Sequence, residues 1–508
     1  MCSIAGIIHG TGVEKMIGAQ KHRGPDDSGF YKDSAIELGM GRLKIIDLVS
    51  ADLAPYQEDE FVLCYNGEIY NYIELRAELA ACGWEFRTTS DTEVLMKAWR
   101  HWGVRMFDKL NGMFAFAIYD KKQRKLLLAR DIAGEKPLYY YHKGDQFVFV
   151  SEAKALQGVV PLQHRSDRFF DAFQHVHIDT LWENVKLLPA ANYLLYDLSN
   201  DTFEIKEYWK FSPREINRAT AVDELEALVE DAVRIRTRSD VPYGLYFSRG
   251  VDSTLISAMH AFAEQFYFDN SQDWKDDFFK NIEHIVWHLD FPVGSLSSYP
   301  LWKLASWAQE KVTVVLSGEG ADEVFGGYVR YMPIAREWEL RQRFPSYSTH
   351  LFGKYFRFFS YLDAYAAITA RNDDVEFVRE TLRPYFEQFD NPITAMGFAD
   401  FKLIMPSLLQ MGDRMASSHS LENRCPFLDR RIIEFGFSLP PDMRIDGLTQ
   451  KVMLRQLLAR RGQDGPLLDE KRGLTITFNQ WFGEADWDRS RYFSLLKEKW
   501  HGRYIKLD

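Results

Sequence analysis

Two segments of the sequence share one pattern: a short apolar run, a loop rich in serine and glycine, and an apolar helical stretch. In the first, residues 241–247 lead into the loop 248–254 (SRGVDST). In the second, residues 312–316 lead into 317–328 (SGEGADEVFGGY). Each pattern predicts a strand, a tight turn and a helix. Free backbone N–H groups and the helix dipole point out of such a turn, so it is suited to bind an anion. An ordinary βα turn is the alternative, but it does not require the acidic residues Glu319, Asp322 and Glu323.

The size and charge of the chain exclude several classes of protein. With 508 residues, of which 46% are hydrophobic and 27% charged, the chain has enough material for more than one packed core. Its net charge of −11 gives no general attraction for nucleic acid. No apolar run approaches the roughly 20 residues that span a bilayer. Four cysteines without a CxxC pair argue against a disulfide framework or a zinc ribbon, and favour a reducing cytoplasm.

The N-terminus contains a candidate nucleophile, Cys2. The first residues lack the basic start and apolar core of a secretion signal. Removal of Met1 would leave a thiol and an α-amine on one residue, and an amine with a pKa of about 7.7–8.0 can act as general base for that thiol. The alternative is a small buried cysteine in a first strand.

Several polar clusters lie among the short strands and turns expected for residues 1–209. Asn66-Gly67 is the typical sequence of a hairpin turn, but an Asn amide beside a Gly N–H is also suited to hold an oxyanion. Arg42 could bind a carboxylate through two hydrogen bonds, and Asp91 and Glu68 could hold an ammonium group. Together these groups would recognise the two ends of an α-amino acid.

Residues 2–6, 22–26, 66–71, 90–93, 110–116, 130–139 and 151–156 together resemble the class II glutamine amidotransferase domain of glutamine-dependent asparagine synthetases. The resemblance implies that residues 1–209 form an N-terminal-nucleophile (Ntn) hydrolase domain, an α/β/β/α sandwich. It also implies that Cys2 hydrolyses glutamine through a thioester and releases ammonia, with Asn66 and Gly67 as oxyanion donors. The implied glutamine-binding residues are Arg42, Ile45, Ile46, Asn66, Gly67, Glu68 and Asp91.

Residues 248–254 resemble the pyrophosphate loop of N-type ATP pyrophosphatases, and 413–415, 420–429, 451–455 and 471–473 resemble signatures of the synthetase domain. For residues 210–508 this implies a PP-loop, doubly wound parallel α/β domain with a helical C-terminal part. ATP would be a substrate, and Asp252 and Asp322 would hold Mg²⁺ against the pyrophosphate oxygens. Glu319 would act as acid or base near the ammonia, and Lys451 would neutralise phosphate charge. The implied ATP and pyrophosphate contacts are Phe247, Ser248, Gly250, Asp252, Ser253, Ser317, Gly318 and Lys451.

The implied activity consists of two half reactions. Glutamine yields ammonia in the first domain, and ATP adenylates a carboxylate in the second, releasing pyrophosphate before ammonia attacks. Aspartate, giving asparagine, is the default acceptor. Because free ammonia is mostly protonated at neutral pH, we expect an enclosed passage between the two sites, lined by apolar residues at the domain junction. Dimers are common in families of this kind, so the sequence leaves a homodimer open.

Some residues depart from the family pattern. Arg249 stands where the pyrophosphate loop usually has glycine, so its side chain either points outward or adds a guanidinium to the polyphosphate site. Residues 253–290 are fewer than the resemblance leads us to expect. We therefore predict that family sequence is absent between 259 and 274, with a smaller omission near 177–179. Phe291 and Ser295 stand where acidic residues are common.

These departures leave three alternatives open. In the first alternative, the chemistry is the same but the acceptor is a carboxylate other than aspartate, in a specialised biosynthetic pathway. A glutaminase with a degraded, nucleotide-binding synthetase domain is the second alternative, and Arg249 is its only support. An intramolecular cyclase is the third, and Cys2 with its full glutamine pocket argues against it.

Overall fold

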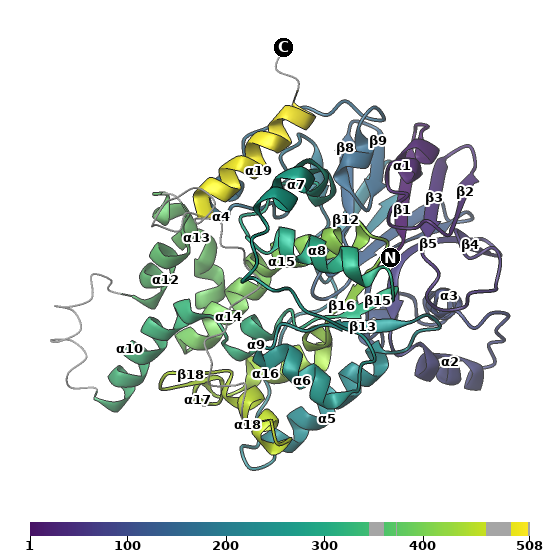
Figure 1. Ribbon diagram of the computed structural model, residues 1–508. Helices are drawn as coiled ribbons and strands as arrows, with labels where there is room; N and C mark the ends of the chain where they lie inside the picture. The colour runs from purple at the N-terminus through teal and green to yellow at the C-terminus, as the bar shows by residue number, and fades with distance from the viewer. Residues whose placement is uncertain (345–359, 372, 464–488, 506–508) are drawn as a thin grey trace.

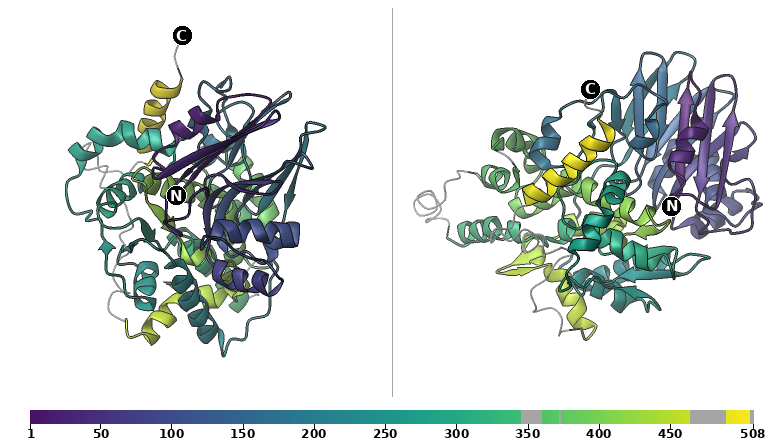
Figure 2. Two further views of the ribbon diagram at one scale, coloured as in Figure 1. Left: turned by 90° about the vertical axis from the view of Figure 1, so that its right-hand side faces the viewer. Right: turned by 45° about the horizontal axis from the view of Figure 1, so that its top comes forward.

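We describe a computed structural model of the chain, which covers residues 1–344, 360–371, 373–463 and 489–505. A domain of two stacked sheets lies against a larger domain in which helices surround a small parallel sheet (Figure 1). Two further views show the stacked sheets beside the mostly helical remainder (Figure 2). The predicted two-domain α/β class is therefore confirmed. The sequence motif at 471–473 lies outside the described residues.

Two six-stranded sheets build the N-terminal domain, with the strand orders β10-β8-β9-β1-β3-β2 and β12-β11-β7-β6-β5-β4. Every pairing given for them is antiparallel. The strands are β1 Ser3–Ile8, β2 Asp27–Lys32, β3 Ile36–Arg42, β4 Tyr56–Glu58, β5 Phe61–Ile69, β6 Gly112–Asp120, β7 Lys125–Arg130, β8 Tyr139–Lys143, β9 Gln146–Val150, β10 Val185–Leu187, β11 Asn192–Asp197 and β12 Thr202–Glu207. The helices are α1 Val13–Ala19, α2 Tyr72–Ala81, α3 Asp91–Trp102 and α4 Arg168–Phe173.

The burial of β1 shows how the sandwich is assembled. Side chains alternate along a strand, so Ile4 and Ile8 join the core between the sheets, whereas Ala5 and Ile7 face the opposite side. That opposite side is covered by α1, and its core continues into the second domain. On the other sheet, α3 packs against β5. The predicted α/β/β/α sandwich is confirmed.

The second domain is built on a four-stranded sheet of order β14-β13-β15-β16, in which every pairing is parallel. Its strands are β13 Tyr243–Tyr246, β14 Gln265–Phe266, β15 Val314–Leu316 and β16 Glu422–Arg424. The main helices are α5 Ala221–Arg236, α6 Val251–Met259, α7 Lys275–Leu289, α8 Ser298–Ala308, α9 Ala321–Phe325, α15 Met405–Ser417, α16 Arg430–Ser438 and α18 Val452–Arg460.

Helices cover both faces of this sheet. Leu245 and Leu316 pack into a core with α5, α6 and α18, while Tyr246 and Val315 face a core that contains α7, α8 and α15. The domain is therefore doubly wound, as predicted. In such a sheet, ligands bind outside the carboxyl ends of the strands. Further elements are α10 Met332–Arg343, α12 Tyr361–Thr369, α13 Val375–Phe386, α14 Pro392–Leu403, α17 Pro441–Arg444, α19 Arg489–Tyr504 and the ribbon β17 Ile445–Asp446 with β18 Thr449–Gln450.

The segment between α6 and α7 contains only a minimal strand. β14 has two residues and pairs with β13 at the edge of the sheet. The family resemblance had led us to expect a full strand here. Among the helices of the described ranges, none combines the length and apolar character that a bilayer span requires.

Candidate active sites

The first candidate site lies at the N-terminal end of β1. The backbone N–H of Cys2 donates to Asn66 Oδ1 at 3.0 Å, which ties the start of the chain to β5. Asn66 is fully buried, yet its Nδ2 has no hydrogen-bond partner within the described part of the chain. A buried donor without a partner is costly. Beside a thiol, such a donor is suited to stabilise an oxyanion.

Gly67 allows a close approach between neighbouring strands. A Cβ atom at this position would lie 2.2 Å from the carbonyl oxygen of Met113, so another residue would displace β6. Asn66 and Gly67 both lie within the ladder of β5 and β6, opposite Ala115 and Phe114. The Asn-Gly pair is therefore not the hairpin turn that its sequence suggests.

Cys2 is partly exposed and not sealed from solvent. Its Sγ lies 4.0 Å from the carbonyl oxygen of Leu43, and burial raises the pKa of the thiol. Met1 precedes it and is fully buried at the domain junction, with its ammonium 3.8 Å from Glu422 Oε2. Burial lowers the pKa of that amine to about 6, against an opposing attraction from Glu422.

The predicted glutamine-binding residues are already bonded to protein groups. The Arg42 guanidinium donates to the carbonyl oxygens of Ile46 at 3.0 Å and Asp47 at 2.6 Å. Asp91 Oδ2 accepts hydrogen bonds from the Tyr65 hydroxyl at 2.8 Å and from the backbone at Ile69. Arg42 therefore braces a loop of the pocket wall, in addition to any contact with a ligand.

Glu68 reaches the second domain. It forms an ion pair with Arg424 at 3.2 Å, while its Oε1 has no partner among the described groups. Burial, and then repulsion from Asp91, raise the pKa of Glu68 well above its ordinary value. An ammonium group placed between the two carboxyls would relieve both effects. Ile45 and Ile46 pack in a core shared with the second domain.

The second candidate site begins where β13 ends. The Ser248 N–H donates to Ser253 Oγ at 3.2 Å, and the two hydroxyls are 3.1 Å apart, which closes the turn before α6. Phe247, partly buried, donates its N–H to the Phe266 carbonyl at 2.9 Å. Gly250 precedes the first residue of α6, so this turn ends at a helix N-terminus.

Arg249 has a φ of 58° in this turn, a left-handed conformation that favours glycine. Its side chain is exposed, and its guanidinium lies 4.3 Å from the centre of the Tyr267 ring. The side chain thus extends toward the segment around β14.

The second turn follows β15 and meets the first. A Cβ atom at Gly318 would lie 2.6 Å from Asp252 Cβ, so the two loops are in contact. The Ser317 N–H donates to the Arg424 carbonyl at 3.0 Å, and its hydroxyl lies 3.6 Å from Cys425 Sγ. Both turns therefore open at the carboxyl edge of the same sheet.

Lys451 bridges the two predicted metal ligands. Its Nζ is 2.6 Å from Asp252 Oδ1 and 2.6 Å from Asp322 Oδ1. A Cβ atom at Gly327 would lie 1.9 Å from Asp322 Oδ1 and 2.1 Å from Lys451 Cε, so glycine makes room for the bridge. Two carboxylates that converge on one cation fit Mg²⁺ when phosphate oxygens complete its shell. Within the described residues no cluster of three or more His, Cys, Asp or Glu side chains suits a metal, so this chain would need those oxygens.

Glu319 is buried next to the second turn. Burial, and repulsion from Glu323, raise the pKa of Glu319 to about 7, although hydrogen bonding to Cys425 and Asn423 opposes this shift. The Asn423 amide donates to Glu319 Oε2 at 3.3 Å, and the Cys425 thiol lies 3.6 Å from the same oxygen. A carboxyl that titrates near neutral pH can accept or donate a proton under working conditions.

Strand β16 connects the two candidate sites. Glu422 faces the Met1 ammonium and Arg424 faces Glu68, both at the first site. Asn423 and Cys425 contact Glu319 at the second. Side chains alternate between the two sides of a strand, so one short segment separates the sites and contacts each of them.

Comparison with known proteins gives the family. Residues 1–209 match the model described as "Glutamine amidotransferase domain", and 224–267 with 259–494 match "Asparagine synthase". Asparagine synthetase [glutamine-hydrolyzing] 1 of Bacillus subtilis is 30% identical over 557 residues, covering 96% of this chain and 87% of that protein.

The chain belongs to the asparagine synthetase family. It is therefore a ligase-type enzyme with a glutamine amidotransferase domain. Putative asparagine synthetase [glutamine-hydrolyzing] 2 of Methanocaldococcus jannaschii is 34% identical over 65% of this chain and 76% of that protein. The Bacillus alignment is longer than the 508 residues of this chain, in keeping with the expectation that some family sequence is absent. Among solved structures, the glutamine phosphoribosylpyrophosphate (PRPP) amidotransferase of B. subtilis covers 62% of this chain and 81% of its own, at 14% identity. Its TM-score of 0.31 is too low to support an argument.

The chain also contains buried charges at the domain junction that sequence reasoning did not assign. Arg23 donates to both carboxylate oxygens of Asp413, at 2.7 and 3.0 Å, and to Glu152 at 2.9 Å. Arg414 pairs with Asp290 at 3.3 Å. These groups are buried, so the junction contains charged as well as apolar residues, and the apolar lining of the expected passage stays a prediction. The motifs 22–26 and 413–415 contained the signal, but only folding brings them together.

Proposed function

We propose that this member of the asparagine synthetase family is a glutamine-dependent amide-forming ligase. It hydrolyses glutamine, adenylates a carboxylate with ATP, and passes ammonia from the first reaction to the second. Aspartate is the default acceptor and asparagine the product. The observation that supports the proposal best is strand β16, because Glu422 and Arg424 face the Cys2 side while Asn423 and Cys425 face Glu319.

In the glutaminase half reaction, Met1 is removed and the Cys2 amine accepts the proton of its own thiol. The thiolate attacks the glutamine side-chain amide, and the unpaired Asn66 Nδ2 with the Gly67 N–H stabilises the oxyanion. The proton passes to the leaving ammonia, and water then cleaves the thioester to give glutamate. Glu68 and Asp91 hold the substrate ammonium, and Arg42, with Ile45 and Ile46, shapes the opposite wall.

Loss of Met1 has a second consequence. Met1 fills a fully buried position between the domains, with its ammonium 3.8 Å from Glu422 and its sulfur 3.4 Å from Arg23 Nη2. Without it, the space next to Cys2 would continue toward β16. We propose this space as the start of the ammonia route. The charged groups around it, Glu422 and Arg424 among them, would exclude bulk water less effectively than an apolar lining, so tight packing of the domains is required.

In the synthetase half reaction, the two turns bind ATP through Phe247, Ser248, Gly250, Ser253, Ser317 and Gly318. Asp252 and Asp322 would hold Mg²⁺, which supplies positive charge to the departing pyrophosphate when bound. Lys451, which the two carboxylates already hold, moves its charge onto the phosphates as the acyl-adenylate forms. The acceptor carboxylate attacks the α-phosphorus and pyrophosphate leaves.

Glu319 acts in the last step. As ammonia attacks the acyl carbon, a proton must leave the nitrogen. A Glu319 carboxylate with a pKa of about 7 is matched to accept it, and AMP departs with its bonding electrons on oxygen.

The three alternatives differ in the support that they retain. Phe291 is fully buried against Tyr139 and Trp500, with ring centroids 5.9 and 6.2 Å apart. The family resemblance led us to expect an acidic residue at this position, so an apolar one favours a carboxylate acceptor other than aspartate. A glutaminase with a degraded synthetase site rested on Arg249. The outward contact of that side chain with Tyr267 weakens this reading. The intramolecular cyclase has no further support.

The deciding experiment supplies glutamine, Mg·ATP and a panel of carboxylates, and measures pyrophosphate and glutamate together. We expect pyrophosphate release that depends on one carboxylate, with aspartate the first to test. Glutamate without pyrophosphate for any acceptor would reject the ligase in favour of the glutaminase. Four free cysteines fit a reducing compartment, so we also propose a cytoplasmic location, and leave a homodimer as a further proposal that sedimentation can test.

A further inference from the structure

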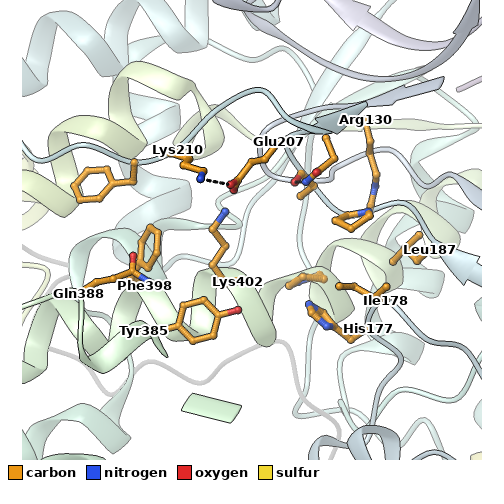
Figure 3. A pocket seen from close by; sticks show the side chains of 15 residues that line it. Arg130, His177, Ile178, Leu187, Glu207, Lys210, Tyr385, Gln388, Phe398 and Lys402 are labelled. Atoms are coloured by element: carbon orange, nitrogen blue, oxygen red, sulfur yellow. Dashed lines mark hydrogen bonds and ion pairs between the residues drawn. The ribbon is translucent and has the colours of Figure 1, made fainter. Parts of the chain in front are cut away.

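A cavity lies between the domains, apart from both candidate active sites. Its volume is about 490 Å³, within the range of small-molecule sites. One wall comes from β7, β10, β11, β12, the segment before β10 and the chain after β12, and the other from α13, α14 and α15 with the residues next to them. Figure 3 shows the side chains that line the cavity. None of its lining residues belongs to the glutamine, nucleotide or metal positions described above. The lining residues used below are Arg130, His177, Glu207, Lys210, Tyr385 and Lys402.

Lys402, in the last turn of α14, points its ammonium into the centre of this cavity (Figure 3). The Nζ lies 5.4 Å from the ring centre of Trp209, 5.7 Å from Phe398 and 5.9 Å from Phe401. Within the described residues it forms no ion pair and no hydrogen bond to an acidic side chain. Burial lowers the pKa of Lys402, and only a longer-range attraction from Glu207 opposes this. An ammonium in such surroundings is poorly compensated.

The other ionisable groups of the cavity are already satisfied or neutral. Glu207 pairs with Lys210 at 3.5 Å, as Figure 3 shows. Arg130 donates to the carbonyl oxygens of Gly134, Lys136 and Leu188, all within 2.9 Å. Burial lowers the pKa of His177 to about 4, so its ring is neutral at pH 7. Among the described residues that line the cavity, Lys402 is therefore the one cation whose contacts are with aromatic rings and not with a carboxylate or carbonyl oxygen.

The remaining lining defines the rest of a ligand. The walls are mixed. Apolar side chains, among them Ile178, Leu187, Pro189, Phe211 and Phe398, lie beside uncharged polar ones such as Asn192, Tyr385 and Gln388. One cation without a carboxylate partner, next to the apolar part of the wall, matches one carboxylate on an apolar body. A phosphate dianion would need further cations or free backbone donors.

We propose that this interdomain cavity is a binding site for a small organic monocarboxylate with an apolar body, whose carboxylate pairs with Lys402 and whose body packs on the aromatic wall. Trp209, Phe398 and Phe401 already surround the ammonium, so an anion bound there would be shielded from water and its attraction to Lys402 strengthened.

A ligand in the cavity would affect the packing of elements that lead to both reaction centres, a consequence that rests on the proposed function. Helix α14 packs closely on α9, because a Cβ atom at Gly397 would lie 2.5 Å from the Glu323 carbonyl oxygen. Helix α9 contains Asp322. On the other wall, Arg130 holds the loop that ends at Lys136, and Lys136 lies 4.0 Å from Asp413 at the domain junction.

The test measures binding of benzoate to the full-length chain by calorimetry, without ATP or glutamine. Benzyl alcohol supplies the ring without the charge, and inorganic phosphate supplies the charge without the ring. We expect benzoate to bind at least tenfold more tightly than either probe. Lys402→Met keeps the apolar stem and removes the charge, so it should weaken benzoate binding at least tenfold, while Lys402→Arg should retain it.

Lys210→Met is the matched control, because Lys210 is a lysine of the same cavity that already has a carboxylate partner. The affinity for benzoate should change less in Lys210→Met than in Lys402→Met. The proposal would be overturned if benzoate did not bind, if benzyl alcohol bound equally well, or if phosphate bound more tightly. An unchanged affinity for benzoate in Lys402→Met would also overturn it. If Lys402→Met does not fold, Lys402→Gln takes its place. Because the readout is binding without turnover, failure of this site and failure of the ligase activity are separate results.

Discussion

The two candidate active sites differ in how their polar groups are satisfied. At Cys2, the Nδ2 of Asn66 and the Oε1 of Glu68 are buried without partners among the residues that the structure describes. At the synthetase site, the Lys451 ammonium already joins Asp252 and Asp322. The first site lacks partners that a substrate would provide, whereas in the second site one ammonium already bridges two carboxylates and leaves one negative charge over. We therefore expect the glutaminase site to be preformed, and the synthetase site to exchange internal ion pairs for nucleotide and metal.

The largest effect is expected from Cys2→Ala, which separates the two sites. Without the thiol no thioester forms, so glutamate production should fall to background. Product formation from added ammonium should persist, because the parallel sheet is untouched. Glutamate and product are measured with either nitrogen source. Cys82→Ala, which changes an exposed free cysteine, is the control. Loss of both activities in Cys2→Ala would contradict two separable sites.

Lys451→Met tests the synthetase site, in which Lys451 joins Asp252 and Asp322. We expect pyrophosphate release to fall about 10²–10³-fold, because a preorganised charge is lost from the transition state. Glutamine hydrolysis should change little. Pyrophosphate and glutamate are assayed in parallel, with Lys311→Met as a surface control whose ion pair with Glu264 is exposed. A parallel loss of glutaminase activity would mean that the two sites are not independent.

Glu319→Gln tests the proton acceptor. Because the pKa of Glu319 is about 7, the fraction of carboxylate, and with it amide formation, should rise between pH 6 and pH 8. In the variant this rise should disappear and the rate of amide formation should fall about 10²-fold, while adenylation persists. Glu323→Gln is the matched control, since the pKa of Glu323 is also about 7 but its Oε1 accepts from Tyr328 at 2.6 Å. A rise that survives in Glu319→Gln would assign the proton elsewhere.

The same shift affects stability with a definite sign. The pKa of Glu319 is higher in the folded chain than its ordinary 4.5, so the folded state binds the proton more tightly. The contribution of Glu319 to the free energy of unfolding is therefore fully present below about pH 4.5. It is lost as the pH rises through 7, at up to about 1.4 kcal/mol per pH unit. The melting temperature of Glu319→Gln, relative to that of the parent chain at the same pH, should accordingly rise from pH 5 to pH 8.

The smallest effect is expected from Arg249→Gly. The exposed contact with Tyr267 is worth only about 0.5–1 kcal/mol, and glycine suits a φ of 58°. We expect the KM for ATP to change less than about fivefold, which corresponds to that energy. A much larger increase would show that the guanidinium turns inward to the polyphosphate when ATP binds.

Much of the fold followed from local patterns. The two strand-turn-helix segments, with the residues that resemble family signatures, indicated the α/β class, the sandwich and the family, and all three are confirmed. The individual site residues stay predictions, although Cys2 with Asn66, and Asp252 with Asp322 and Lys451, do lie together. Local sequence misled at Asn66-Gly67, where pairing with β6 overrides the turn propensity of the two residues.

The sequence by itself determined which chemistry the chain contains, because a nucleophile, anion-binding turns and acidic groups are properties of single short segments. Only the tertiary structure decided how these segments meet. Glu422 lies beside the chain terminus and Asn423 beside Glu319 because adjacent side chains of one strand point to opposite sides. Among the described residues, Phe398 and Phe401 near Lys402 lie on its own helix, but the third ring, that of Trp209, reaches it only through tertiary packing. Such contacts join residues far apart in the chain, and no local pattern specifies them.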